Sequence, residues 1–285
     1  MFKSLNPGVI GVTTSNLEEG LRAAEVGGFD GLEINPDEIA DRAEKEGIEA
    51  IKAKFQEAGI RPAAWGLPNG WRGDDAQYAQ MIQELPRLAK ASSAIGCTRL
   101  FTWILPGSNE KTLDENHRWH LSRLKPAVQI LGDYGCSFGL EYIGPKTSRE
   151  SSKHMFYYKL KTMLALAREI GPNAGLMLDS WHWHTAHETV SDLENLKPTD
   201  VVHVHVNDAP AGIETDSQID SQREIPGATG VIDIAGFLKT LNRIGYDGPV
   251  TPEPFNKGLH ELPSDEARLK LVGESMKKIW SMAGL

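Results

Sequence analysis

The chain has 285 residues, of which 40% are hydrophobic and 24% charged, and its formal net charge is −9. These values are ordinary for a soluble globular protein, and the length allows one large domain or two ordinary ones. The acidic balance disfavours nucleic acid as the main partner, because phosphate binding needs clusters of basic residues. No apolar run approaches the roughly 18–20 residues of a membrane-spanning helix, and the first residues lack the apolar core of a secretion signal. We therefore expect a cytoplasmic protein without a membrane partner.

Short apolar segments recur along the chain, bounded by glycine, proline or asparagine, as expected for strands buried on both faces. Helical patterns lie between them, and several of these end on glycine, which closes a helix in the left-handed conformation. The expected strands are 8–14, 29–34, 61–66, 98–105, 136–143, 174–179, 201–208 and 248–255.

The alternation of strands and helices predicts a parallel sheet, because a parallel connection needs a crossover. Eight such units within 285 residues fit a (β/α)8 barrel. An open doubly wound sheet would favour a glycine-rich dinucleotide fingerprint after the first strand, and "GVTTSNLEEG" does not supply one. Without a linker or a low-complexity segment, residues 1–285 are expected to form a single barrel domain.

Polar side chains stand at four consecutive strand ends, where a barrel of this kind builds its active site. Glu141, Asp179 and Glu253 end the fifth, sixth and eighth strands, and His205 lies near the end of the seventh. Adjacent strands are about 4.8 Å apart, so the four side chains can converge. Without a cation, such buried groups would repel one another or shift their pKa values. We expect one divalent metal ion, with Mn²⁺, Co²⁺, Mg²⁺ and Zn²⁺ all compatible with these ligands.

Each of these residues also has an ordinary structural interpretation. Asp179 would serve well as the cap of the following helix. His203 and His205 face the same side of their strand, and we expect His205 to be the ligand with a hydrogen-bonded His203 behind it. His184 and His187, in "LMLDSWHWHTAH", are assigned to the following helix and given no chemistry.

The segments "LEYIGP", "LDSWH", "HVHVND" and 226–255 resemble the xylose isomerase-like sugar isomerases and epimerases, including the ketose 3-epimerase and inosose isomerase or dehydratase types. The resemblance covers nearly the whole chain. It implies that one divalent cation is held by Glu141, Asp179, His205 and Glu253.

The resemblance also implies substrate-binding residues. His182 matches the histidine three residues after the strand-six aspartate, and Arg223 matches an arginine that binds substrate oxygens. The turn at 227–230 is looser than the family's usual pattern, which leaves the metal ligands unaffected. A DNA-repair branch with three zinc ions needs histidines where this chain has Trp65 and Trp103, so a site for one metal is expected.

The expected reaction is proton transfer at a carbon next to a carbonyl, through a metal-stabilised ene-diolate of a keto-sugar or related polyol. Glu141 and Glu253 would take and return the proton, as the resemblance also implies. A lyase or dehydratase, of the inosose dehydratase or keto-glycoside type, would use the same ligands. A non-catalytic barrel subunit is a third interpretation, which the intact ligand set disfavours.

Five of the seven tryptophans fall at or just after strand ends. Tryptophan stacks well on sugar rings and flat aromatic groups, so Trp65, Trp103 and Trp181 are expected to contact the substrate. The alternative is that they close the barrel or cover the interface of a homo-oligomer. The substrate-contacting interpretation favours a substrate bulkier than a free ketose, such as a cyclic polyol ketone or a keto-glycoside. The five tryptophans are Trp65, Trp71, Trp103, Trp181 and Trp183.

Overall fold

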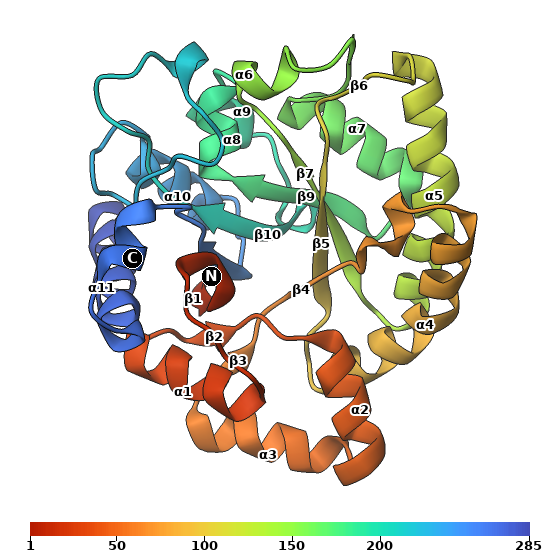
Figure 1. Ribbon diagram of the computed structural model, residues 1–285, viewed down its shortest axis with the longest axis vertical. Coiled ribbons are helices and arrows are strands. Elements are labelled where there is room, and N and C mark those ends of the chain that lie inside the picture. Colours follow the sequence, from red (N-terminus) through yellow and green to blue (C-terminus); the bar gives the residue numbers. More distant parts are fainter.

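A sheet of nine parallel strands lies at the centre of the computed structural model, which describes residues 1–285, and helices surround this sheet (Figure 1). The strand order is β3-β2-β1-β11-β10-β9-β7-β5-β4. The strands are β1 (Phe2–Leu5), β2 (Gly31–Leu32), β3 (Arg61–Pro62), β4 (Trp65–Gly66), β5 (Arg99–Ile104), β7 (Ser137–Tyr142), β9 (Ala174–Asp179), β10 (Val201–Val206) and β11 (Pro249–Pro252).

The two ends of this order, β3 and β4, are consecutive pieces of one segment. β3 pairs with β2, and β4 pairs with β5. Backbone hydrogen bonds continue on both sides, from Ile34 N–H to the Ala64 carbonyl at 2.9 Å and from Leu67 N–H to the Phe101 carbonyl at 2.8 Å. The third strand of an eight-stranded barrel is therefore split in two, and the predicted single-domain (β/α)8 fold is confirmed.

The helices begin at polar caps and several end on glycine. Asn16 accepts a hydrogen bond from Glu19 N–H at the start of α1, which ends before Gly28 with φ 69°. Asp74 forms a reciprocal capping box at the start of α4. The helices are α1 (Leu17–Gly27), α2 (Pro36–Glu46), α3 (Ile48–Ala58), α4 (Asp75–Ala94), α5 (Leu113–Asp133), α6 (Lys146–Arg149), α7 (Leu160–Ile170), α8 (Ser180–Thr185), α9 (Val190–Leu193), α10 (Ile234–Arg243) and α11 (Asp265–Ala283).

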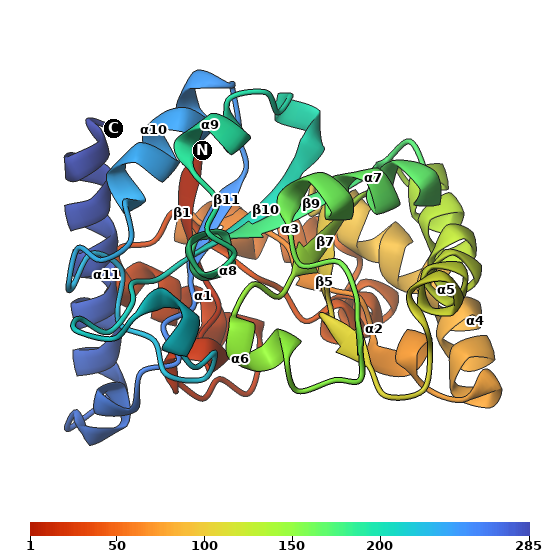
Figure 2. The ribbon, with the colours of Figure 1, turned by 90° about the horizontal axis from the view of Figure 1, so that it is seen from above.

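Smaller elements complete the fold around the barrel. An antiparallel pair, β6 (Gly107–Ser108) with β8 (His154–Met155), joins the loops that follow β5 and β7. α11 runs along one side of the barrel, and α4 and α5 lie on the opposite side (Figures 1 and 2). No helix combines the length and the apolar character needed to cross a membrane. The 3-10 helices are η1 (Gly8–Ile10), η2 (Asn69–Arg72), η3 (Pro198–Asp200), η4 (Thr215–Ser217) and η5 (Lys257–Glu261).

The first strand differs from the expectation. The apolar run 8–14 forms η1 and a loop, and the strand lies earlier, at β1. Pro7 has no N–H for a strand ladder, and its carbonyl instead accepts backbone bonds from the η1 turn. Gly11, at φ 75°, ends that turn. A short apolar run does not by itself distinguish a strand from a buried turn or helix. Each of the other seven expected segments contains strand residues.

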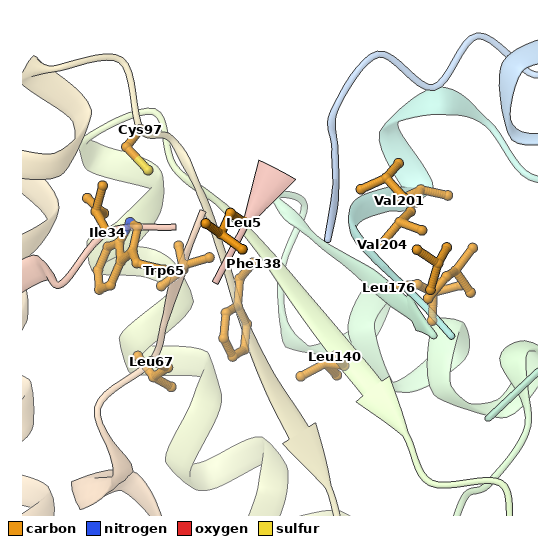
Figure 3. Close-up of a cluster of buried hydrophobic side chains, with 14 of the residues drawn as sticks. Leu5, Ile34, Trp65, Leu67, Cys97, Phe138, Leu140, Leu176, Val201 and Val204 are labelled. Atoms are coloured by element: carbon orange, nitrogen blue, oxygen red, sulfur yellow. The ribbon is translucent and has the colours of Figure 1, made fainter. Parts of the chain in front are cut away.

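The core fills the barrel and the space between strands and helices. Figure 3 shows part of it, with side chains from β1, β4, β7 and β9. Trp65 belongs to this cluster and is fully buried. The rigid packing of the core fixes the strand ends, on which the candidate site depends.

Candidate metal and active site

The four predicted metal ligands meet at the carboxyl end of the sheet. Glu141, Asp179, His205 and Glu253 each offer one ligand atom, and these atoms lie within 4.8 Å of one another. The register aligns them, because His205 pairs with Asp179 on one side and with Thr251 on the other. Their strands β7, β9 and β10 lie side by side in Figure 1.

Asp179 caps the following helix and also faces the candidate site. Its Oδ1 caps α8 by accepting the Trp181 N–H at 2.7 Å, and it also accepts from Asn207 Nδ2 at 2.9 Å. Its Oδ2 is bound by Arg223 Nη1 at 2.7 Å. Burial would raise the pKa of Asp179, but Arg223 and the nearby histidines hold this pKa below its usual range. The residue is therefore an anion with one oxygen committed to the helix and the other directed at the site.

Glu141 is buried, and its Oε1 has no hydrogen-bond partner. Burial, with the carboxylates of Glu253 and Asp179 nearby, raises the pKa of Glu141 well above its usual range. His205 also lacks hydrogen bonds at both ring nitrogens. Its Nδ1 lies 3.3 Å from Glu253 Oε2. These unpaired atoms are what a cation would satisfy, so three carboxylates and one imidazole fit a divalent metal ion.

Arg223 is the buried cation of the site. Its Nη1 donates to Asp179 at 2.7 Å and to Glu253 Oε2 at 2.9 Å. Its Nη2 donates to Asp220 Oδ1 at 2.7 Å. The guanidinium thus offsets the buried charges of Asp179 and Glu253. It is itself held in place by Asp220, from the loop after β10.

His182 stands beside Glu141 and Arg223. Its Nδ1 accepts the backbone N–H of Gly144 at 3.2 Å, so a neutral His182 carries its proton on Nε2. Nε2 lies 3.8 Å from Glu141 Oε1 and 3.4 Å from Arg223 Nη2. Burial lowers the pKa of His182 against the opposing pull of Asp220 and other carboxylates. His182 is therefore arranged as a neutral hydrogen-bond donor.

A cavity of about 450 Å³ lies over Glu141, His182, Arg223 and Glu253. Its buried lining includes these polar side chains, and three apolar side chains are exposed at its rim: Trp103 (41%), Leu105 (55%) and Phe255 (40%). Arg72 stacks behind Trp103, 3.7 Å from the ring centroid, and Phe255 has φ 37°, a conformation that costs energy for a bulky residue. The lining residues are Trp103, Leu105, Pro106, Glu141, Ile143, Ser148, Ser151, Ser152, His182, Asp220, Arg223, Glu253 and Phe255.

Of the three tryptophans predicted to contact substrate, only Trp103 lines this cavity. Trp65 and Trp181 are fully buried, and Trp71 and Trp183 are almost fully buried. Their burial has a physical reason. Tryptophan is a large apolar residue, and a strand end of a barrel gives access to the core as well as to the mouth.

Three further histidines lie outside the predicted ligand set. His203 Nε2 is 2.9 Å from Glu33 Oε1, and its ring stacks on Phe101. His187 contacts Asp216 at 2.7 Å on the surface, and His184 is partly buried away from the four ligands. Sequence reasoning did not single out five residues that contact the site or its walls: Glu33, Arg72, Asn207, Asp220 and Phe255.

Glu33 had a readable signal, because it ends "FDGLE" in the second strand segment by the same rule that identified the other carboxylates. Asp220 had none. It lies in the long loop after β10, where spacing along the chain says little about position.

The fold and the site together define a (β/α)8-barrel protein with a candidate metal centre at the carboxyl end of its sheet. Residues 21–279 match the family described as xylose isomerase-like TIM barrel, and the chain belongs to this family.

Similar proteins span almost the same length. The inosose isomerase of Halalkalibacterium halodurans is 27% identical over 258 residues, covering 89% of this chain and 88% of that protein. The structure of a xylose isomerase domain protein from Alicyclobacillus acidocaldarius has a TM-score of 0.85 and 28% identity, covering 99% of both chains. The IOLI protein, solved with a bound zinc atom, has a TM-score of 0.76 and 20% identity over 98% of both chains, which shows a shared fold.

Proposed function

We propose that the protein is a divalent-metal-dependent isomerase or epimerase that moves a proton on the carbon beside the carbonyl of a keto-sugar or cyclic keto-polyol. The convergence of four ligand atoms within 4.8 Å, two of them from glutamates, carries this proposal. The similarity to an inosose isomerase along 89% of the chain supports an enzyme that acts on carbohydrates.

Glu141, Asp179, His205 and Glu253 would hold one divalent cation. The cation, when bound, supplies the positive charge that makes a proton next to a carbonyl acidic enough to transfer. The zinc atom of the IOLI structure supports a divalent ion, and Mn²⁺, Co²⁺ and Mg²⁺ suit the same ligands.

Glu141 and Glu253 are the proposed proton carriers. Glu141 lies near the end of β7 and Glu253 directly follows β11. These strands are separated in the sheet by β9 and β10, so the two glutamates approach the cavity from different sides. Burial raises the pKa of Glu141, so this carboxylate accepts a proton readily. Glu253 is oriented by Arg223 Nη1 at 2.9 Å. Two carriers on different sides are what an epimerisation needs, because the proton leaves one face and returns to the other.

His182 and Arg223 would hold substrate oxygens. His182 offers an Nε2–H fixed by the Gly144 contact, and Arg223 offers a rigid guanidinium. Both groups line the cavity, so a carbonyl or hydroxyl placed beside Glu141 lies within reach of a donor. These two residues would orient the reacting carbon and disperse charge on its oxygen.

The cavity supports a substrate larger than a free ketose. Its volume of about 450 Å³ and its apolar rim of Trp103, Leu105 and Phe255 suit a ring that carries a further group. A cyclic polyol ketone or a keto-glycoside meets this description, with its polar ring on the floor and its substituent at the rim.

The test is deuterium incorporation from D2O, read by NMR, after the metal-loaded protein is incubated with linear ketoses, inososes and keto-glycosides. The expected result is exchange beside the carbonyl of a cyclic substrate. Chelator-treated protein and the Glu141→Gln variant serve as controls. Preference for small linear ketoses would contradict the proposal of a substrate larger than a free ketose. Loss of a substituent or of water from the substrate would identify a lyase. Absence of exchange with every compound would overturn the proposal and favour a non-catalytic barrel.

A further inference from the structure

Behind the metal centre lies a second cluster, formed by Glu33, His203 and His205. Glu33 directly follows β2, which is separated from the β10 histidines by β1 and β11 in the sheet order. Its side chain therefore crosses the barrel interior to reach a ligand on another part of the wall. The Glu33 side chain is 5% exposed, so its charge must be paired inside the protein.

Glu33 has a donor at each oxygen. Oε2 accepts a hydrogen bond from Asn6 Nδ2 at 2.9 Å. Oε1 lies 2.9 Å from His203 Nε2 and 3.6 Å from His205 Nε2. His203 and Asn6 thus hold the carboxylate of Glu33 in place. Its Oε1 also faces His205, the predicted metal ligand.

The two nitrogens of His205 face different carboxylates. Nδ1 lies 3.3 Å from Glu253 Oε2 on the cavity side, and Nε2 points toward Glu33. The edge of the Phe101 ring, 5.5 Å between centroids, confines the imidazole further. A histidine ligates a metal through one neutral nitrogen while the other keeps its proton and donates it to an acceptor. Nδ1 is therefore the nitrogen that faces Glu253, one of the other predicted ligands.

We infer that Glu33 is a positioning residue of the metal centre: with the cation bound, Glu33 Oε1, which lies 3.6 Å from His205 Nε2 in this structure, would accept the Nε2–H of His205 and thereby present Nδ1 to the cation. This inference rests on the proposed metal-dependent function. Asn6 and His203 act one step further away, by fixing the Glu33 carboxylate.

A second metal ion held by Glu33, His203 and His205 is the competing interpretation. It is disfavoured because Oε1 and the His203 ring are already paired at 2.9 Å and Oε2 is engaged by Asn6. The stoichiometry of metal binding separates the two interpretations.

The test is isothermal titration of the full-length protein with Zn²⁺, comparing wild type with Glu33→Gln. The expected result is one ion per chain and an affinity about 10–100-fold lower in the variant. The matched control is Glu38→Gln. Glu38 lines the same 430 Å³ cavity as Glu33 but contacts Leu17 N–H and Arg42, so zinc affinity should stay at the wild-type value.

A second measurement does not depend on whether the variant folds. In ¹⁵N spectra of histidine-labelled, zinc-loaded wild type, His205 should bind through Nδ1 and carry its proton on Nε2. Ligation through Nε2, equal zinc affinity in Glu33→Gln and wild type, or two ions per chain falling to one in the variant would each overturn the inference. Absence of divalent-metal binding by the wild type would instead remove the proposed function and this role with it.

Discussion

Arg223 donates a hydrogen bond from Nη1 to Asp179 Oδ2 at 2.7 Å, and both side chains are almost fully buried. The same nitrogen reaches Glu253, so one guanidinium offsets two carboxylates that are also candidate metal ligands. Removing one partner of a buried ion pair costs about 3–5 kcal/mol, because the other charge is left without compensation. If the proposed divalent cation binds here, the charge balance of the site would link folding stability to that cation.

Arg223→Gln should lower stability by about 3–5 kcal/mol in chelator, and a saturating divalent cation should recover part of this loss. The reason is that the cation offsets the carboxylates left without Arg223. Thermal unfolding with EDTA and with Zn²⁺ measures both effects. Arg243→Gln is the control, since Arg243 pairs with Glu194 on the surface and its loss should cost little. An Arg223→Gln variant as stable as wild type in EDTA would contradict the argument.

Glu141→Gln and Glu253→Gln should each reduce substrate deuterium exchange by about 10²–10⁴-fold, because each removes a proposed proton carrier. Each should also weaken metal binding, since each removes a charged ligand. Exchange rates by NMR and zinc titration measure the two losses on the same samples. Glu150→Gln, an exposed carboxylate beside Lys146, is the matched control and should change neither. Full exchange in either site variant would exclude that glutamate as a carrier.

Glu188 gives a pH dependence that is independent of the metal site. Burial raises its pKa to about 7 from the ordinary 4.5, although Tyr142 and the Leu160 N–H donate to it. The folded chain binds this proton more tightly than the unfolded chain does. The resulting stability is complete below pH 4.5 and is lost as the pH rises through about 7.

The expected size of this loss is about 3 kcal/mol at most. Glu188→Gln should remove it, so the unfolding free energy of wild type relative to the variant should fall between pH 4.5 and 7.5. Urea denaturation at several pH values gives the difference, which cancels other titrating groups common to both proteins. A difference that stays flat, or rises with pH, would contradict the sign of the pKa shift.

The convergence of the four predicted ligands could be foreseen from sequence because barrel strands stand in register, so residues at or next to the strand ends are placed by topology. Asp179 and His205 are an example, since they pair directly between β9 and β10. The same rule applied to the second strand would have identified Glu33. The first strand was misplaced because an apolar run carries no periodicity that separates a strand from the turn after Pro7.

Side-chain direction was harder to predict than strand position. Trp65 and Trp103 both follow from strand-end reasoning, yet one packs in the core and the other lines the cavity. Whether a side chain near a strand end enters the core depends on packing against distant elements. The ion pair between Arg223 and Asp220 was also beyond prediction, because the loop after β10 has no repeating pattern to locate it.

Gly144→Ala should displace His182 and raise KM. A Cβ at Gly144 would lie 2.2 Å from the His182 carbonyl and 2.7 Å from Thr185 Oγ1, so α8 or the loop after β7 must move. The Gly144 N–H also fixes the His182 ring through Nδ1 at 3.2 Å. Overpacking of this kind costs about 1–3 kcal/mol, visible in thermal unfolding, while kinetics report the loss of a positioned donor. Gly66→Ala is the control, because a Cβ there meets nothing within 4 Å. If Gly144→Ala retained both KM and melting temperature, the close approach would not be what positions His182.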